Sequence, residues 1–273
     1  MRKKALEISC YVGGAGAFGV FLRWLQDMLA FNDDGLADPS AFHVMVPAFL
    51  LAAALVFWRF LKVFEKNKLS LPEDFRLAFR NESRLFVPIR WAIGLLMAAG
   101  GLLLLMTSEL DKYAGLLRVL SLAAIAAGVA FPLLMSAPGR EKNSVNLLCL
   151  LSFLPIFLYA TWLIYDYRAN AINSVIWSYV IEVLTVIAAM VAFFRIAGFF
   201  FGVPQPRKAM FSAMFAGMLC LLSLADERYM GMHVILFATA LMFIFMNWVM
   251  IENLQQGEVK AQKPKKDDGF DHL

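Results

Sequence analysis

The sequence predicts an all-helical, polytopic membrane protein with about eight transmembrane helices and with both termini in the cytoplasm. Three observations lead to this fold class. Of the 273 residues, 61% are hydrophobic and only 17% are charged, whereas an average soluble domain is about 45–50% apolar and about 25% charged. The hydrophobic residues gather in runs of about 20, the length that crosses a hydrocarbon core of about 30 Å. Basic residues concentrate on alternate connections between these runs.

Eight apolar runs are separated by charged or polar breaks, and each is apolar around its whole circumference, as expected for a helix among lipids or other helices. They cover residues 8–31, 42–64, 86–108, 114–136, 145–165, 174–202, 209–225 and 232–254. Residues 1–254 are therefore predicted to form one transmembrane bundle. The first run is too long for the apolar region of a cleaved signal peptide. Pro132 and Pro155 interrupt the fourth and fifth runs and predict kinks there.

Lysine and arginine divide unequally between the two sides that these spans define. If the N-terminus is cytoplasmic, the outer loops hold only Lys112, Arg168 and Arg228, beside many acidic residues. The predicted cytoplasmic set is Arg2, Lys3, Lys4, Arg59, Lys62, Lys66, Lys68, Arg76, Arg80, Arg84, Arg90, Arg140, Lys142, Arg207, Lys208, Lys260, Lys263, Lys265 and Lys266. This asymmetry predicts cytoplasmic termini. It also explains the net charge of +4 by topology, so we expect no nucleic-acid partner.

The tryptophans and cysteines agree with the predicted spans. All six tryptophans fall near predicted span ends, where interfacial belts place them: Trp24, Trp162 and Trp177 at outer ends, and Trp58, Trp91 and Trp248 at inner ends. The three cysteines lie within spans and are expected to be free thiols that pack as small apolar groups: Cys10, Cys149 and Cys220.

The cytoplasmic loop 65–84 contains a candidate interfacial helix. Residues 70–73 (Ser-Leu-Pro-Glu) have the spacing of a capping box. A helix that starts there places Arg76, Arg80 and Arg84 on one stripe beside Phe75, Ala78, Phe79 and Phe86. We expect the arginines to contact anionic lipid headgroups and the aromatic rings to enter the acyl boundary; the alternative is a solvated connector. Residues 255–273 lack an apolar period and are predicted to be a disordered cytoplasmic tail.

The first run contains an arginine, Arg23, and an ionisable residue inside a span is a candidate functional residue because its insertion is costly. Gly16, Gly19 and Arg23 share a helix face, and small residues there let another helix approach closely. We therefore expect Arg23 to face protein. Asp27 lies one turn further along the helix, within reach of an ion pair. Arg23 is interpreted either as the partner of Asp27 or as a ligand-facing residue.

Glu182 in the sixth run is the second candidate. It lies on a stripe of small and polar residues with Ser178, Thr185 and Ala189, which predicts that it faces the bundle or a wet cavity. Two interpretations stay open: an ion pair with Arg23, or a carboxylate that binds a proton or a cation. The candidate ligand or ion site thus comprises Arg23, Asp27, Glu182 and Thr185.

Other ionisable residues near the spans have simpler interpretations. Arg118 and Arg195 are close enough to span ends for their side chains to reach the surface. His43 and His233 begin the second and eighth runs, where interfacial histidines are expected, and no Cys or carboxylate cluster supports a metal or haem site. We predict no cofactor.

Two outer turns have similar sequences. Residues 111–115 (Asp-Lys-Tyr-Ala-Gly) and 227–231 (Glu-Arg-Tyr-Met-Gly) both read acid, base, Tyr, any residue, Gly. A duplicated four-helix unit would produce this likeness. The alternative is that any short membrane hairpin favours an interfacial Tyr, a base and a turn-forming Gly.

The sequence does not identify a substrate. It lacks a zinc-protease, phosphate-loop or serine-hydrolase motif, so we expect no enzymatic activity. The leading hypothesis is a small-solute transporter, or a membrane-embedded substrate-binding component, in the cell membrane of a bacterium. The alternative is a structural or regulatory subunit that docks a protein partner.

Overall fold

The computed structural model describes residues 1–29, 44–81, 83–137, 145–171 and 179–256. Within these ranges, eight helices are long and apolar enough to cross a membrane, and each predicted apolar run coincides with one of them. They are α1 (Arg2–Leu29), α2 (Met45–Lys66), α4 (Phe86–Thr107), α5 (Ala114–Leu134), α6 (Val145–Asn170), α7 (Val180–Phe200), α8 (Pro206–Leu222) and α9 (Met230–Glu252). The predicted all-helical class with eight long apolar helices is confirmed.

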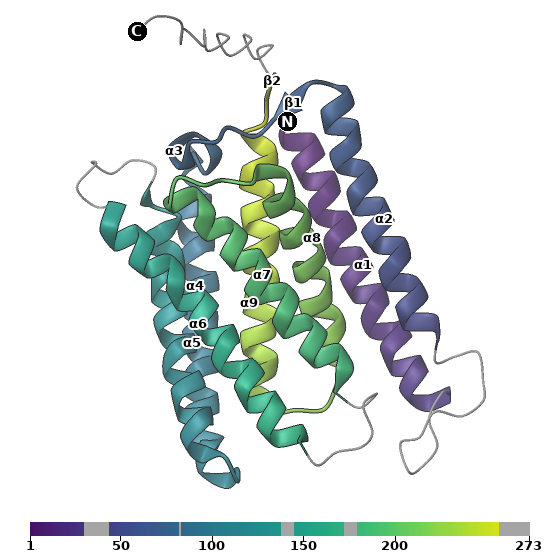
Figure 1. Ribbon diagram of the computed structural model, residues 1–273, viewed down its shortest axis with the longest axis vertical. Helices are drawn as coiled ribbons and strands as arrows, with labels where there is room; N and C mark the ends of the chain where they lie inside the picture. The colour runs from purple at the N-terminus through teal and green to yellow at the C-terminus, as the bar shows by residue number, and fades with distance from the viewer. Residues whose placement is uncertain (30–43, 82, 138–144, 172–178, 257–273) are drawn as a thin grey trace, which may run out of the picture.

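Successive long helices run in opposite directions, so the bundle has two ends (Figure 1). We call the end where α1 begins and α9 finishes the basal end, and the end where α1 finishes and α9 begins the distal end. In the predicted topology the basal end is cytoplasmic. Both predicted proline interruptions, Pro132 and Pro155, lie inside helices, α5 and α6 respectively.

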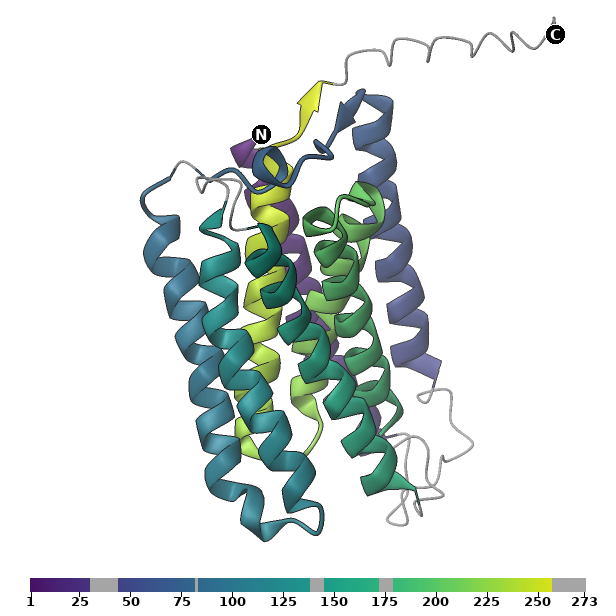
Figure 2. The same ribbon diagram turned by 60° about the vertical axis from the view of Figure 1, so that its left-hand side comes forward.

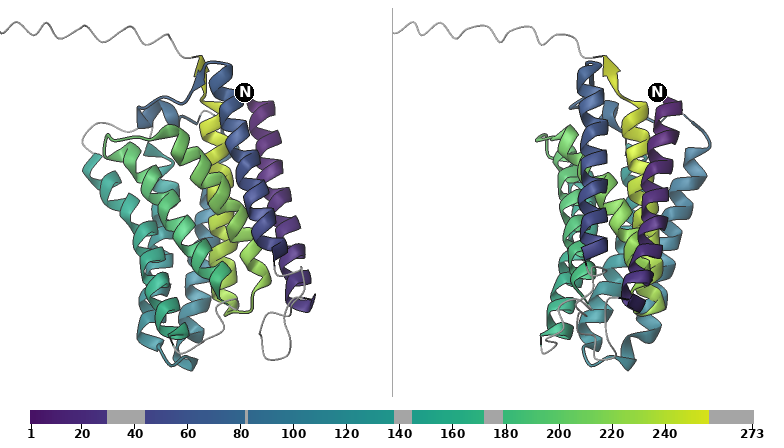
Figure 3. Two further views of the ribbon diagram at one scale, coloured as in Figure 1. Left: turned by 45° about the vertical axis from the view of Figure 1, so that its right-hand side comes forward. Right: turned by 90° about the vertical axis from the view of Figure 1, so that its right-hand side faces the viewer.

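The last helix, α9, lies at the centre of the bundle. Helices α1, α4 and α8 pack along it, and Figure 2 shows α9 in yellow between the α4–α5 pair and the α7–α8 pair. Side chains of α6 and α7 also reach α9: Tyr159 donates a 2.6 Å hydrogen bond to Thr239, and the ring centroids of Phe193 and Phe243 are 4.5 Å apart. Helix α2 packs against α1 and α8 and lies at the right-hand edge of the view in Figure 1, and Figure 3 shows it beside α1.

Small residues allow the closest approaches between helices, as is usual in membrane bundles. A Cβ atom added at Gly16 or Gly19 would lie 2.5 Å or 2.9 Å from side-chain atoms of Leu221 and Leu222 on α8. The predicted packing face of α1 is therefore confirmed. At the distal end, a Cβ at Gly231 would lie 2.5 Å from the backbone nitrogen of Leu104 on α4.

The predicted interfacial helix in loop 65–84 is wrong in its length. Helix α3 (Phe75–Ala78) is a single turn, so it cannot align Arg76, Arg80 and Arg84 on one helical stripe. Its N-cap is Asp74, whose carboxylate accepts a 2.8 Å hydrogen bond from the backbone N–H of Arg76, and not the predicted capping box at 70–73. The three arginines are exposed, and their contact with headgroups stays a prediction.

Two aromatic residues of this loop pack against the bundle. Phe75 packs on Phe200 with ring centroids 4.2 Å apart, and Phe79 packs edge-on against Phe199 at 5.4 Å. Asn253, just after α9, donates hydrogen bonds to backbone carbonyls of this segment. The loop folds onto the bundle because α7 and the end of α9 offer it partners that a sequence pattern does not show.

Two short strands close the basal end. Strand β1 (Leu69–Ser70) pairs antiparallel with β2 (Gln255–Gln256). The predicted disordered tail therefore begins two residues too early, and its remainder, 257–273, lies outside the described residues.

The two hairpins at the distal end have the same turn construction. Helix α4 continues into the 3-10 helix η2 (Ser108–Leu110) before Asp111, and α8 continues into η6 (Ser223–Ala225) before Asp226. In both turns the backbone N–H of the aspartate donates to the carbonyl of a buried serine, at 3.3 Å and 3.4 Å. The structure therefore aligns Asp111 with Asp226, and not with Glu227 as the sequence comparison did.

The helix packing does not extend this likeness to a whole duplicated unit. Helix α4 packs along α9, whereas the equivalent pair in a duplication, α8 and α5, has no comparable packing in the described residues. The two halves of the chain therefore share the construction of this turn and do not share the packing of their helices.

Candidate functional site

A series of charged side chains runs through the distal end of the bundle. Its members come from α1, from the turn between η6 and α9, from α7 and from α6. We call it the distal network and define it as Asp27, Arg23, Asp226, Arg228, Glu182 and Asp166.

Arg23 connects α1 to the turn between η6 and α9. Its Nε atom donates a 2.8 Å hydrogen bond to Oδ1 of Asp226, and Nη1 donates to Oε1 of Gln26 at 2.9 Å. Nη1 also lies 3.4 Å from Oδ1 of Asp27. The Arg23 side chain is 3% exposed, because Gly16 and Gly19 on the same face bring α8 close. A buried guanidinium requires such pairing to offset its desolvation.

Asp226 bridges two guanidinium groups. Its second oxygen, Oδ2, accepts a 2.9 Å hydrogen bond from Nη2 of Arg228 and a 3.2 Å bond from Oγ of Ser223. Arg228 also donates from Nη1 to the Ser223 carbonyl at 2.7 Å. The 3-10 turn η6 thus presents Ser223 and Asp226 together, and both side chains hold the arginine in a fixed position. Asp226 is 8% exposed.

Glu182 is a second acidic partner of Arg228. It lies in the first turn of α7, where a carboxylate is favoured by the helix dipole, and its Oε1 is 3.3 Å from Nε of Arg228. The indole of Trp162 donates a 3.0 Å hydrogen bond to the same oxygen. Trp162 is fully buried, so its predicted place in an interfacial belt is wrong.

Asp166 is the most deeply buried carboxyl group of the network. It is 2% exposed and lies beside both Glu182 and Trp162. Its Oδ2 atom has no hydrogen-bond partner among the described residues. Two carboxyl groups and one indole donor therefore meet between α6 and α7.

A second carboxylate cluster lies next to the network. Asp111 accepts 2.9 Å hydrogen bonds at Oδ2 from the hydroxyls of Tyr165 and Tyr229, and a 2.6 Å bond at Oδ1 from the backbone N–H of Tyr113. These contacts connect the α4–α5 turn to α6 and to the start of α9. Burial raises the pKa of Tyr229 first, and its hydrogen bond to Asp111 and the charge of that carboxylate raise it further.

The predicted site residues have different outcomes. The Arg23–Asp27 ion pair is confirmed, but the predicted Arg23–Glu182 pair is wrong, because Asp226 and Arg228 stand between them. Thr185 is buried and its hydroxyl donates to the Ile181 carbonyl of its own helix at 2.7 Å. Thr185 therefore packs, and it does not extend the network.

Sequence reasoning did not identify three members of the distal network, Asp166, Asp226 and Arg228, or the donor to Glu182, Trp162. The first three were counted as outer-loop charges and the last as a belt residue. One sequence signal pointed to Asp226: a serine stands three residues before an aspartate in both distal turns, 108–111 and 223–226.

The remaining ionisable candidates lie apart from the network or at its edge. Arg118 pairs with Glu109 at 2.9 Å on the surface, and Arg195 donates to Gln205 at 2.9 Å. Nε2 of His233 lies 3.0 Å from the Asp226 carbonyl oxygen, whereas His43 lies outside the described residues. No group of three metal-ligating side chains occurs in the part of the chain that the structure describes.

Comparison of the chain with protein-family models, with curated proteins and with solved structures finds no match. The functional interpretation therefore depends on the geometry of the site.

Proposed function

We propose that the chain is a carrier or binding component for a small solute in the cell membrane of a bacterium, and that its distal network takes up a proton or a small cation. In this proposal all eight helices span the bilayer, the basal end lies in the cytoplasm and the distal end faces outward. The basic residues near the basal end and the acidic distal turns support this orientation.

The imbalance of charge in the distal network is the observation that carries the proposal. The solvent-shielded part of the network holds three carboxyl groups, Asp166, Glu182 and Asp226, against the guanidinium groups of Arg23 and Arg228, while Asp27 lies at its edge with a side chain that is 42% exposed. Unbalanced charge is costly in a buried site. A proton or a small cation would offset the excess negative charge, whereas an anionic solute would increase it.

The pair formed by Asp166 and Glu182 is the proposed binding position. The two groups lie side by side, and Oδ2 of Asp166 lacks a partner among the described residues. A positive charge placed between them would reduce their mutual repulsion. It would also weaken the attraction of Glu182 for Arg228, the contact that joins α7 to the η6–α9 turn. Ion binding is thereby linked to the packing of helices.

The test uses the purified chain in liposomes adsorbed on a solid-supported membrane, where a jump in H⁺ or Na⁺ concentration produces a transient current if charge is bound. The wild type is expected to give a current with one of these ions, and Glu182→Gln and Asp166→Asn are expected to abolish it. Glu109→Gln is the matched control, because Glu109 is a distal carboxylate in an exposed ion pair. A wild type without current for either ion contradicts the proposal.

The second candidate function is a structural or regulatory subunit. It is favoured by the ion pairs that two nearly buried guanidinium groups form, Arg23 with Asp226 and Arg228 with Glu182. These ion pairs connect α1 to α7 through the turn between η6 and α9. In that case no current is expected from the wild type. A partner protein would co-purify, and its retention would be lost when Arg76, Arg80 and Arg84 at the basal end become Glu.

A further inference from the structure

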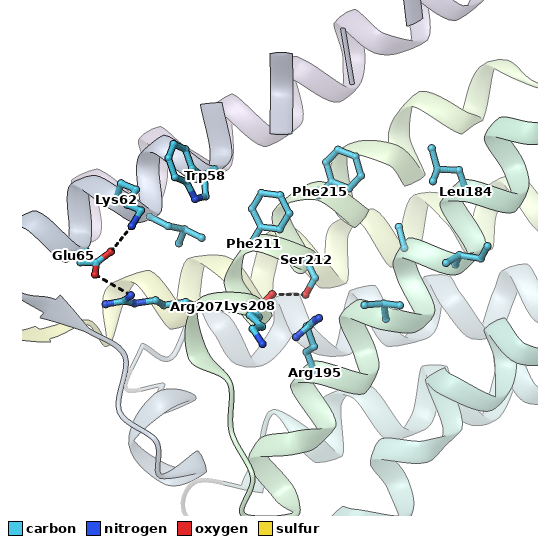
Figure 4. A pocket seen from close by; sticks show the side chains of 14 residues that line it. Trp58, Lys62, Glu65, Leu184, Arg195, Arg207, Lys208, Phe211, Ser212 and Phe215 are labelled. Carbon is cyan, nitrogen blue, oxygen red and sulfur yellow. Dashed lines mark hydrogen bonds and ion pairs between the residues drawn. The ribbon is translucent and has the colours of Figure 1, made fainter. Parts of the chain in front are cut away.

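A groove lies between α2, α7 and α8 and extends from the basal end of the bundle to Leu184, near the start of α7 (Figure 4). Its volume is about 510 Å³, within the range of about 300–1,000 Å³ that is common for small-molecule sites. It is open along one side, where Leu184, Ile187 and Val191 of α7 are exposed. That opening faces lipid if the helices span the bilayer.

The distal part of the groove is apolar. Leu184 and Ile187 form one wall, and Trp58 of α2 lies on the other side. Phe211 and Phe215 of α8 line the groove with their rings stacked at a centroid distance of 6.1 Å. This part has the chemistry that a hydrocarbon chain requires.

The basal part of the groove is cationic. Figure 4 shows Lys62, Arg195, Arg207 and Lys208 around this end, together with the carboxylate of Glu65. Glu65 lies 3.3 Å from Nζ of Lys62 and 3.1 Å from Nη1 of Arg207. Four basic side chains against one acidic side chain leave an excess of positive charge. Lys62, Arg207 and Lys208 are exposed and Arg195 is half-buried, so a ligand can reach this charge.

The two parts of the groove are spaced like a membrane lipid. Leu184 and Arg195 are eleven residues apart on α7, which corresponds to about 16 Å at a rise of 1.5 Å per residue. One leaflet contributes about half of the hydrocarbon thickness of about 30 Å. An acyl chain that lies along the groove therefore ends near Leu184 when its headgroup is at Arg195.

We propose that this groove binds one anionic phospholipid of the leaflet at the basal end. The headgroup phosphate is held by Lys62, Arg195, Arg207 and Lys208, and an acyl chain lies against Phe211 and Phe215. The predicted cytoplasmic position of the basal end agrees with this occupant, because anionic lipids are enriched in the cytoplasmic leaflet. A zwitterionic lipid would not offset the excess positive charge, and a soluble anion would leave the apolar part of the groove empty.

This site is independent of the distal network. It shares no residue with the network, and it requires only that the helices span a bilayer. Loss of charge movement in the Glu182→Gln variant would therefore leave lipid binding intact.

Native mass spectrometry of the delipidated protein with added phosphatidylglycerol tests the proposal. The wild type is expected to bind one molecule with higher affinity than further ones, and to prefer it to phosphatidylcholine. The double variant Arg207→Gln, Lys208→Gln is expected to bind about 30-fold more weakly, since each basic residue near an anionic headgroup contributes about 1 kcal/mol. Ala188→Leu fills the groove without a change of charge and is expected to reduce binding as well.

Two control variants match these changes outside the groove. Arg76→Gln with Arg84→Gln removes two exposed basal cations, and Ala52→Leu enlarges an exposed alanine on α2; both are expected to bind like the wild type. Equal binding by the folded groove variants overturns the proposal. So does equal binding of phosphatidylcholine, or displacement of the lipid by glycerol 3-phosphate alone, which would indicate a site for free anions.

Discussion

Two carboxylates in this protein each lie between two cations, and they differ in their exposure to solvent. Asp226 at the distal end lies between Arg23 and Arg228 and is 8% exposed. Glu65 at the basal end lies between Lys62 and Arg207 and is 40% exposed. The contacts are similar, but a buried pair must offset its own desolvation, whereas an exposed pair is screened by water.

This difference separates the roles of the two ends. In the distal network both guanidinium groups, those of Arg23 and Arg228, contact several partners, so a change in one charge affects the others. At the basal end the cations surround an open groove and remain accessible to a ligand. A similar arrangement of charges can therefore serve as an internal network in one place and as a binding surface in another.

The largest expected effect comes from removing the bridging charge at the buried end. Asp226→Asn leaves Arg23 and Arg228 close together with reduced compensation, and breaking a buried pair costs about 3–5 kcal/mol. We expect a loss near the lower limit, about 3 kcal/mol, because Asp27 and Glu182 still pair with the two arginines. The midpoint of thermal unfolding in detergent measures the change.

The matched variant at the exposed end is Glu65→Gln, which removes the same charge from between two cations. Its unfolding midpoint is expected to match that of the wild type within experimental error. Glu227→Gln serves as a second control, since Glu227 is adjacent to Asp226 but exposed. If Asp226→Asn unfolds at the wild-type temperature, the distal network does not stabilise the fold.

A second prediction compares packing at the two ends. Gly231→Ala places a Cβ atom 2.5 Å from the backbone nitrogen of Leu104, and such overpacking costs about 1–3 kcal/mol. Ala188→Leu adds more atoms, but they enter the basal groove and are expected to leave the unfolding midpoint unchanged. Gly115→Ala is the control in the other distal hairpin, because a Cβ there would have no neighbour within 4 Å. Equal destabilisation by Gly231→Ala and Ala188→Leu would mean that the groove is not open.

The sequence predicts the eight helices well because a membrane span must be long and apolar, whatever it packs against. It predicts the ends of elements less well. Loop 65–84 has the amphipathic pattern of an interfacial helix, but an aromatic face such as that of Phe75 and Phe79 can be buried by protein as readily as by lipid. The sequence pattern is the same whether protein or lipid covers the aromatic face. Only the positions of α7 and the end of α9 show that protein covers it.

The site was predicted in part for a related reason. The cost of a charge inside a span identifies Arg23 and Glu182 without knowledge of the fold. Their direct partners, Asp226 and Arg228, lie in a turn, where charged residues are ordinary. Arg23 and Asp226 are 203 positions apart in the chain, and neither local spacing nor periodicity can report a contact of that range. The basal groove is formed by three helices and has no signal in any one of them.

The smallest of these expected effects concerns a neutral donor at the distal end. Tyr229→Phe removes the 2.9 Å hydrogen bond to Asp111 and leaves that of Tyr165, so we expect a loss of about 1–2 kcal/mol at neutral pH. The raised pKa of Tyr229 means that the folded state retains the phenolic proton when the unfolded state begins to lose it. This contribution is fully present below the usual tyrosine pKa of about 10 and is lost as the pH rises through that value toward the raised one.

Thermal unfolding measured from neutral pH to above pH 10 checks both parts of this prediction. The wild type is expected to lose more stability than Tyr229→Phe over the alkaline range, so the difference between them becomes smaller as the pH rises. Tyr167→Phe is the control, because Tyr167 is 76% exposed and should behave like the wild type throughout. A constant difference between wild type and Tyr229→Phe would mean that the tyrosine contributes by packing alone. The stability of the distal end would then come from its ion pairs. The difference in stability between the two ends would come only from the burial of charge at the distal end.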